Sequence, residues 1–189
     1  MIGKDFRCQE LWNAIYTVYA WNNYRCLWIY PAGRNRGSCR RNNIFGDSDT
    51  TYDFMKLGKL YRPLAEGRAD VMIGDRFAGG MEKGAMPWSH RIGVRLLSAM
   101  GRRRYRTDVR DFHCGMRGLT RKAAEQLAFR TGGMEFATEM IALAAKAGLR
   151  IGQCPVRLRK CTLDRKSKLR TLPDGNRHLR YMLRNPGKE

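Results

Sequence analysis

The sequence has no long apolar run, few acidic residues and no cysteines or histidines at the spacing of a zinc site. No apolar run approaches the roughly 20 residues that a helix needs to cross a bilayer. The six cysteines include no CxxC pair and the three histidines add no zinc-site spacing, so we expect free thiols in a reducing compartment. Only 17 Asp and Glu stand against 37 Lys and Arg, which gives a net charge of +20. This surplus predicts an anionic partner: nucleic acid, an acidic membrane surface or a phosphate-rich substrate.

The composition and the patterning predict one folded α/β domain. An apolar fraction of 43% supports a buried core and excludes disordered and low-complexity classes, and 189 residues allow one domain. Residues 1–43 show no period that predicts an element. Apolar runs and helical periods then alternate, with strands expected at 44–45, 69–74 and 151–159 and helices at 54–66, 89–100, 120–129, 134–147 and 174–184. Strands that alternate with helices predict an α/β sheet.

The helix expected at 89–100 carries its apolar residues on one side. Ile92, Leu96, Leu97 and Met100 fall on that side, which is typical of a helix that packs on a core. The sequence therefore predicts that this side faces the protein interior.

Two carboxylates follow the first of the expected strands. Asp47 and Asp49 are separated by one residue at a strand end, where they could converge on Mg²⁺ or Mn²⁺. Such an ion bridges the oxygens of a nucleotide diphosphate, and open α/β sheets bind ligands beyond the carboxyl ends of their strands. The same triplet is common in ordinary turns, where Asp bonds its own backbone, so both interpretations stay open.

Three further clusters could carry chemistry, and the first of them would lie at the same sheet edge as Asp47 and Asp49. Arg76 directly follows the strand at 69–74. Asp111 could orient an attacking group, and Arg117 could make bidentate hydrogen bonds to a phosphate. A basic loop with Ser167 and Lys168 could close over a diphosphate and neutralise the leaving group. Each cluster has a plainer alternative, a surface arginine or a solvated loop.

Two neighbouring pairs of polar residues carry a weaker signal. His113 and Cys114 are adjacent, so on an extended segment their side chains point opposite ways. We therefore expect a structural histidine and a buried thiol rather than a nucleophile pair. Glu135 and Glu139 lie one helical turn apart, either facing a site or on an ordinary exposed face.

Taken in order, these motifs resemble family 2 glycosyltransferases of the GT-A fold, and specifically the polyprenol-phosphate (dolichyl-phosphate) mannose or glucose synthases. The resemblance runs nearly continuously from residue 44 to 183. The matching segments are IFGDSDTTYDF, LAEGRADVMIGDRF, HRIGVRLLS, TDVRDFHCGMRGL, GMEFATEM, AAKAGLRIGQCPVRL and RKSKLRTLPDGNRHLRYML. The resemblance implies an incomplete GT-A (Rossmann-like) domain at 44–184, with a mixed sheet, flanking helices and a tail at 185–189.

The resemblance also implies a reaction. A hexose would pass from a nucleotide-diphosphate sugar to a polyprenyl phosphate with inversion. Because the lipid phosphate is already anionic, alignment and charge neutralisation matter more than a strong base. The resemblance implies that Asp47 and Asp49 are the carboxylates that bind the metal and the nucleotide sugar, with Asp49 preferred as the direct ligand. It implies that Arg76 and Arg117 bind phosphate and that Asp111 orients the acceptor. Ser167 and Lys168 would belong to a flexible loop over the diphosphate.

A lipid acceptor would also explain the positive charge. The basic stretch at 102–106 and the amphipathic C-terminal helix could rest on anionic headgroups. We therefore expect a cytoplasmic protein that works peripherally at the membrane. A plain core-facing helix is the alternative for the C-terminal segment.

Several departures limit the resemblance. Val94 stands where the family usually has Asn, Asp75 where it has Ser, and Arg165 where a Gly commonly opens the loop. Residues 1–43 lack the expected Pro-x-x-Asn-Glu turn and the strand that ends in Asp-Asp-Gly-Ser. This segment is interpreted as translated out of frame, as a truncated remnant or as a divergent region. For the chain as written, we expect weak stability and little or no transferase activity.

Two other classes stay open. A nucleic-acid-binding module is favoured by the net charge and the RRRYR cluster, although no helix-turn-helix, zinc finger or RNP-like motif is present. A non-catalytic relative that interacts with membranes is the third interpretation.

Overall fold

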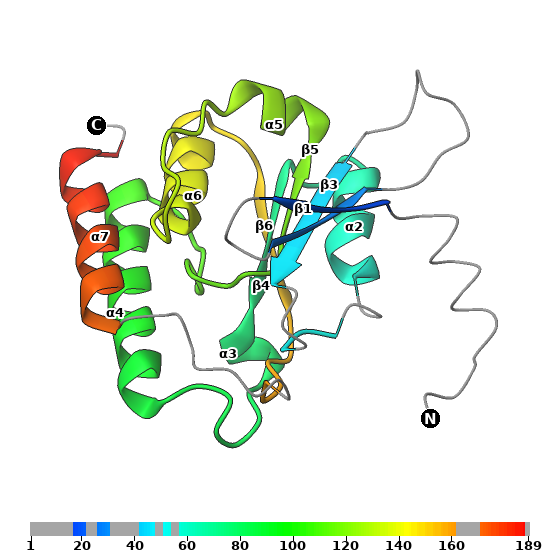
Figure 1. Cartoon of the computed structure of the whole chain (residues 1–189). Coiled ribbons are helices and arrows are strands. Elements are labelled where there is room, and N and C mark those ends of the chain that lie inside the picture. Colours follow the sequence, from blue (N-terminus) through cyan, green and yellow to red (C-terminus); the bar gives the residue numbers. More distant parts are fainter. Residues whose placement is uncertain are drawn as a thin grey trace, which may run out of the picture.

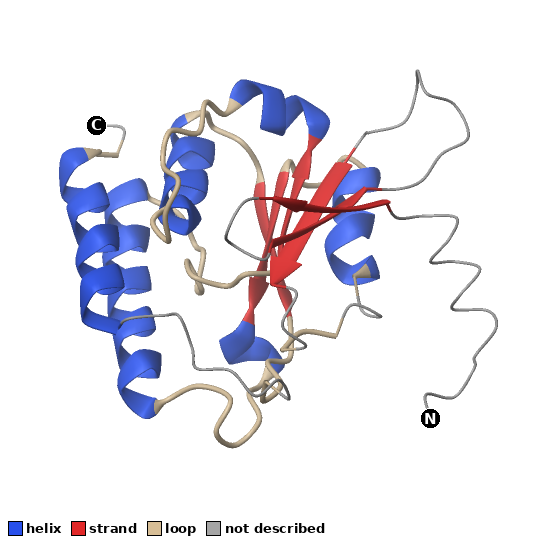
Figure 2. Cartoon of the chain, in the orientation of Figure 1, coloured by secondary structure: helices blue, strands red, loops and turns tan. Residues whose placement is uncertain are grey.

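The computed structural model describes residues 17–21, 26–30, 42–47, 51–53, 57–161 and 171–187. A central six-stranded sheet has helices on both sides (Figures 1 and 2). The strands are β1 (Thr17–Trp21), β2 (Cys26–Tyr30), β3 (Asn42–Asp47), β4 (Val71–Asp75), β5 (Arg117–Thr120) and β6 (Ile151–Pro155). The helices are α2 (Gly58–Ala65), α3 (Arg76–Gly79), α4 (Trp88–Tyr105), α5 (Arg121–Gln126), α6 (Phe136–Lys146) and α7 (Thr171–Arg184).

The order of the strands is β1-β2-β3-β5-β4-β6. β5 runs antiparallel to both of its neighbours, so β3 and β4 run in the same direction, and β6 is parallel to β4. The carboxyl ends of β3, β4 and β6 therefore meet at one edge of the sheet, together with the amino end of β5. The mixed sheet with flanking helices confirms the α/β class predicted from the sequence.

The helices form unequal layers on the two faces of the sheet. α2 covers one face, while α6, α4 and α7 lie on the other, with α4 and α7 side by side and farthest from the sheet (Figure 1). Gly118 of β5 lets α2 approach closely, because a Cβ there would lie 2.7 Å from a methyl group of Leu64. None of the helices in the described part of the chain is both long and apolar enough to cross a membrane.

Local signals placed several elements correctly. The strand expected at 69–74 is β4. The side chain of Thr120 caps α5 by accepting from the backbone N–H of Ala123 at 3.2 Å. Gly148 follows α6 with φ of 69°, the left-handed conformation expected after a helix end. β6 is an edge strand, as Pro155 predicted.

Two elements differ from the sequence-based expectation. The first 43 residues, to which periodicity assigned no element, contribute an antiparallel hairpin of β1 and β2 that pairs with β3. On α4, the prediction that Ile92, Leu96 and Met100 face the core is wrong, because these three side chains are exposed. The opposite side is buried instead, because Gly101 allows the helix to pack against the ring of Phe112.

Candidate functional site

The predicted site residues that the structure describes gather at the edge where β3, β4 and β6 end. Asp47 ends β3, Arg76 follows β4, and Arg117 begins β5. Arg117 pairs with Phe45 on one side and with Ile73 on the other, which sets the three strand ends level. Asp49, Ser167, Lys168 and the side chain of Asp47 lie outside the described residues.

Asp75 closes β4 and opens α3. Its Oδ1 accepts from the backbone N–H of Phe77 at 2.9 Å and of Ala78 at 3.0 Å. Ser and Asp are both favoured at this N-cap position. The departure from the family's Ser is therefore conservative here, because either side chain can hold the turn that presents Arg76.

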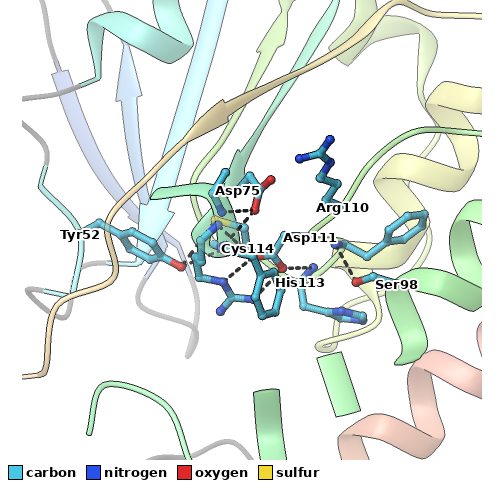
Figure 3. Close-up of polar contacts among 12 residues, drawn as sticks. Tyr52, Asp75, Ser98, Arg110, Asp111, His113 and Cys114 are labelled. Atoms are coloured by element: carbon cyan, nitrogen blue, oxygen red, sulfur yellow. Dashed lines mark hydrogen bonds and ion pairs between the residues drawn. The ribbon is translucent and has the colours of Figure 1, made fainter. Parts of the chain in front are cut away.

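Arg76 and Asp111 form a buried bidentate ion pair (Figure 3). The Arg76 Nε donates to Oδ2 at 2.6 Å, and Nη2 donates to Oδ1 at 2.7 Å. The carboxylate also accepts from the backbone N–H groups of Arg76 and His113. Burial opposes the charge of Arg76, but Tyr52 and Asp111 raise the pKa of its guanidinium well above the ordinary value. In this arrangement Asp111 positions Arg76 and fixes the start of its own loop.

Arg117 is also buried, but its partners are uncharged. Nε donates to the carbonyl of Cys114 at 2.8 Å, Nη1 to that of Ala137 at 2.7 Å, and Nη2 to that of Phe112 at 2.5 Å. Burial lowers the pKa of its guanidinium. The predicted phosphate contact of Arg117 stays a prediction; its hydrogen bonds favour a structural role that ties the 112–114 loop to α6.

Tyr52 contacts this loop at Cys114 (Figure 3). The Tyr52 hydroxyl accepts from the backbone N–H of Gly115 at 3.3 Å and lies 3.7 Å from the Cys114 sulfur. Cys114 is fully buried, and burial raises the pKa of its thiol to about 12. The expectation of a buried thiol is therefore confirmed.

His113 packs against His178 of α7, with ring centroids 4.3 Å apart. Within the described residues neither ring nitrogen of His113 has a hydrogen-bond partner, whereas His178 Nδ1 pairs with the Thr138 hydroxyl at 2.9 Å. Burial, and after it Arg117, lowers the pKa of His178 to about 4. Burial, and after it His178, puts the pKa of His113 well below 6.5. Both shifts favour neutral rings near pH 7, and the packing of His113 against His178 agrees with the structural role predicted for it.

α4 supports the loop that carries Asp111. Ser98 accepts from the backbone N–H of Phe112 at 3.1 Å, as Figure 3 shows. Gln153 of β6 holds the other end of the loop, accepting from the N–H of Arg110 at 2.6 Å and donating to the Asp108 carbonyl at 2.9 Å. The sequence did not predict these supports, because their partners are 14, 43 and 45 residues away.

Glu139 fits neither interpretation offered by the sequence. It is buried and accepts from the N–H groups of Arg130 and Thr131, both at 3.0 Å, and from the Thr131 hydroxyl. It thus organises the segment before α6 instead of facing solvent or a site. Burial of a carboxylate is stable only with such partners, and a short-range pattern does not reveal them.

Carboxylates suited to a metal were expected at this edge. In the part of the chain that the structure describes, no group of three or more His, Cys, Asp or Glu side chains could hold a metal ion. The carboxylates of Asp47 and Asp49, which form the motif Asp-x-Asp (DxD), are not among the side chains described. Their chemistry suits a hard divalent cation, and the described end of β3 puts the backbone of Asp47 at the edge where β4 and β6 also end.

Comparison with known proteins identifies relatives of this chain by their sequence. Residues 44–128 match the family described as "Glycosyl transferase family 2". The "Low-salt glycan biosynthesis hexosyltransferase Agl6" of Haloferax volcanii is 37% identical over 166 residues, which cover 87% of this chain and 39% of that protein. The "Glycosyltransferase AglD" of the same organism is 27% identical over 115 residues, 60% of this chain and 18% of that protein. The chain thus spans less than half the length of these relatives.

Proposed function

The chain belongs to glycosyltransferase family 2, and from this premise we propose that it transfers a hexose from a nucleotide-diphosphate sugar to a polyprenyl phosphate with inversion. The observation that carries the proposal is the shared sheet edge. There the end of β3 with Asp47, the start of α3 with Arg76 and the loop with Asp111 come together. Ligands of open α/β sheets bind at such an edge.

The donor would bind through the DxD motif and the basic loop. Asp47 and Asp49 would hold Mg²⁺ or Mn²⁺, with Asp49 as the preferred direct ligand. When bound, the ion neutralises charge on the diphosphate leaving group. Ser167 and Lys168 would close over the same diphosphate. These assignments rest on the resemblance and on the place of Asp47 at the end of β3.

Arg76 supplies a fixed positive charge beside the reacting phosphates. Its guanidinium is buried and held in one orientation by two hydrogen bonds to Asp111. A charge that is already oriented stabilises developing negative charge without reorganisation at the moment of reaction. Asp111 would therefore orient the acceptor chiefly through the position of Arg76.

The proposed reaction is a single displacement. An anionic oxygen of the lipid phosphate forms a bond to the anomeric carbon, and the bond from that carbon to the diphosphate oxygen breaks. The electron pair leaves with the nucleoside diphosphate. Because the nucleophile attacks from the face opposite the leaving group, the configuration at the anomeric carbon is inverted. No proton has to be removed from the nucleophile, which suits an edge that offers positive charge rather than a strong general base.

The acceptor would be reached at a membrane surface. The basic residues of α4 and α7 would rest on anionic headgroups at the cytoplasmic side. The end of α4 contributes Arg102, Arg103 and Arg104, and α7 contributes Arg177, Arg180 and Arg184.

Metal-dependent donor binding tests the proposal. We expect the purified chain to bind a GDP- or UDP-hexose in the presence of Mg²⁺ or Mn²⁺, and to lose binding with a chelator, as measured by calorimetry. Asp49→Asn should weaken that binding roughly tenfold or more, whereas Asp108→Asn, at an exposed carboxylate in the 107–110 segment, should leave it unchanged. Metal-insensitive, steeply salt-dependent binding of DNA or RNA would contradict the proposal.

A further inference from the structure

α4 has two faces of opposite behaviour. The buried face consists of Val94, Ser98, Gly101 and Tyr105, and it holds the loop with Asp111. This face is small and partly polar, and packing of α4 against Phe112 depends on it. The helix is therefore fixed to the protein by the side that looks less apolar in sequence.

The outer face is apolar and exposed. Trp88 is 75% exposed, Ile92 58%, Leu96 62% and Met100 39%. They recur every four residues and so follow one side of a helix of 3.6 residues per turn. Single exposed apolar residues are ordinary, but an exposed stripe along a whole helix marks an interaction surface.

Positive charge surrounds this stripe. α4 contains five arginines and no Asp or Glu, and α7 beside it contains three arginines and one carboxylate, Asp174, which is buried. Arg91, Arg95 and Arg103 of α4 are exposed. Apolar residues with Trp on one side of a helix and arginines beside them are typical of helices that lie in a lipid interface.

An arginine beside the stripe links α4 to the candidate site. The guanidinium of Arg95 lies 4.7 Å from the ring centre of Phe77 in α3, the helix that begins with Arg76. α7 is joined to the other end of α4, where Arg104 donates to the Leu183 carbonyl at 3.2 Å, and Leu183 is itself exposed. A surface seated on the outer face of α4 would thus adjoin the helix that presents Arg76.

We propose that the stripe of Trp88, Ile92, Leu96 and Met100 docks on an anionic lipid bilayer, with α4 lying in the plane of the interface. This inference rests on the proposed function for the identity of the acceptor, and it deepens it by assigning the membrane contact to the apolar face of α4 as well as to its arginines. The apolar side chains enter the boundary between headgroups and acyl chains, and the arginines contact the headgroup phosphates.

Vesicle flotation tests this docking surface. The full chain is mixed with vesicles of equal parts phosphatidylcholine and phosphatidylglycerol, or of phosphatidylcholine alone. We expect flotation with the anionic vesicles, and a loss of roughly tenfold or more in partitioning for Ile92→Gln/Leu96→Gln. Arg91→Gln/Arg103→Gln should lower partitioning on anionic vesicles. The charge-matched control Lys59→Gln/Arg62→Gln alters exposed residues of α2, across the sheet in Figure 1, and should have the smaller effect.

The outcomes separate this inference from the proposed function. Thermal unfolding midpoints equal to that of the unaltered chain verify that the variants fold, since all of the substituted residues are exposed. No flotation with anionic vesicles, or flotation unaffected by Ile92→Gln/Leu96→Gln, overturns the docking surface. A second overturning result would be that the stripe joins two copies of the chain. Light scattering would then show a dimer that is lost in Ile92→Gln/Leu96→Gln, while vesicle binding persists in that variant. Flotation without metal-dependent donor binding leaves the docking surface standing and removes the proposed function.

Discussion

Two buried arginines lie at neighbouring strand ends, and the protein satisfies their hydrogen bonds with different kinds of acceptor. Arg76 is paired with the carboxylate of Asp111, whereas Arg117 donates to three backbone carbonyls. A carboxylate can be exchanged for another anion, such as a phosphate, because both satisfy the same planar guanidinium. Backbone carbonyls cannot be replaced without moving the chain. The difference separates a residue suited to ligand binding from one suited to holding the loop.

The largest expected effect on stability comes from removing the carboxylate that pairs with Arg76. Asp111→Ala leaves the buried guanidinium of Arg76 without its counter-ion, so the free energy of unfolding should fall by about 3–5 kcal/mol. Urea denaturation measures the change. In the double variant Arg76→Met/Asp111→Ala the loss should be smaller than in Asp111→Ala alone, because position 76 no longer carries a buried charge without its counter-ion. Equal losses in the two variants would mean that the ion pair is not the source of the effect.

Loss of the hydrogen bonds from Arg117 to backbone carbonyls should lower the free energy of unfolding somewhat less. Arg117→Lys keeps the charge but replaces the planar group by a compact ammonium that cannot reach three separated carbonyls, so the free energy of unfolding should fall by about 2–3 kcal/mol. Arg121→Lys is the matched control, since Arg121 is exposed and paired with Glu125 on the same helix, and should change stability by about 0.5 kcal/mol or less. A similar change in both variants would show that Arg117 is not a structural clamp.

Two glycines of α4 sharpen the comparison by testing the support of the Asp111 loop. A Cβ at Gly101 would lie 2.5 Å from the ring of Phe112, so Gly101→Ala should destabilise by about 2 kcal/mol through overpacking. A Cβ at Gly93 of the same helix would meet nothing within 4 Å among the described residues. Gly93→Ala should therefore stabilise by about 0.5–1 kcal/mol through helix propensity. Thermal unfolding of both variants gives the signs, and equal signs would contradict the packing.

The smallest expected effect is a dependence of stability on pH through His178, whose pKa Arg117 helps to lower. The pKa of His178 is about 4 in the folded chain, lowered by burial and then by Arg117, against an ordinary value of 6.5. Between these values the unfolded chain binds the proton and the folded chain does not. The stabilising contribution is therefore complete above about pH 6.5 and is lost as the pH falls toward about 4.

The free energies of unfolding measured near pH 7 and near pH 5.5 should differ by about 1 kcal/mol through this residue. In His178→Gln, which can keep a hydrogen bond to Thr138, the dependence should become shallower. The remaining slope would include His113 and His90, whose pKa values burial lowers in the same direction. A slope unchanged by His178→Gln would show that His178 does not titrate in this window.

Local features of the site followed from short stretches of sequence. Asp47 at a strand end, Arg76 after β4, the cap of Thr120 and the stop at Gly148 depend on neighbours within a few residues. Propensity and capping act over that range, so these predictions were confirmed by the described structure. The family was also accessible, because its motifs occur in a fixed order along the chain.

The partners of the site residues were not accessible in the same way. Asp111 lies 35 residues from Arg76, and the contact between them depends on where β4, α3 and α4 pack. The carbonyl of Ala137 that holds Arg117 is 20 residues away and carries no side-chain signal at all. The hairpin of β1 and β2 likewise exists through pairing with β3, which residues 1–43 do not reveal on their own.

The sequence by itself determined the α/β class, the family and the strand end that carries Asp47, because each depends on local pattern and motif order. The tertiary structure decided that Asp111 holds Arg76, that Arg117 holds backbone, and that Leu96 faces outward. Periodicity shows which residues share a side of a helix, but not which side meets the protein. On α4 that choice was made by close packing, since only the side with Gly101 lets the helix approach Phe112.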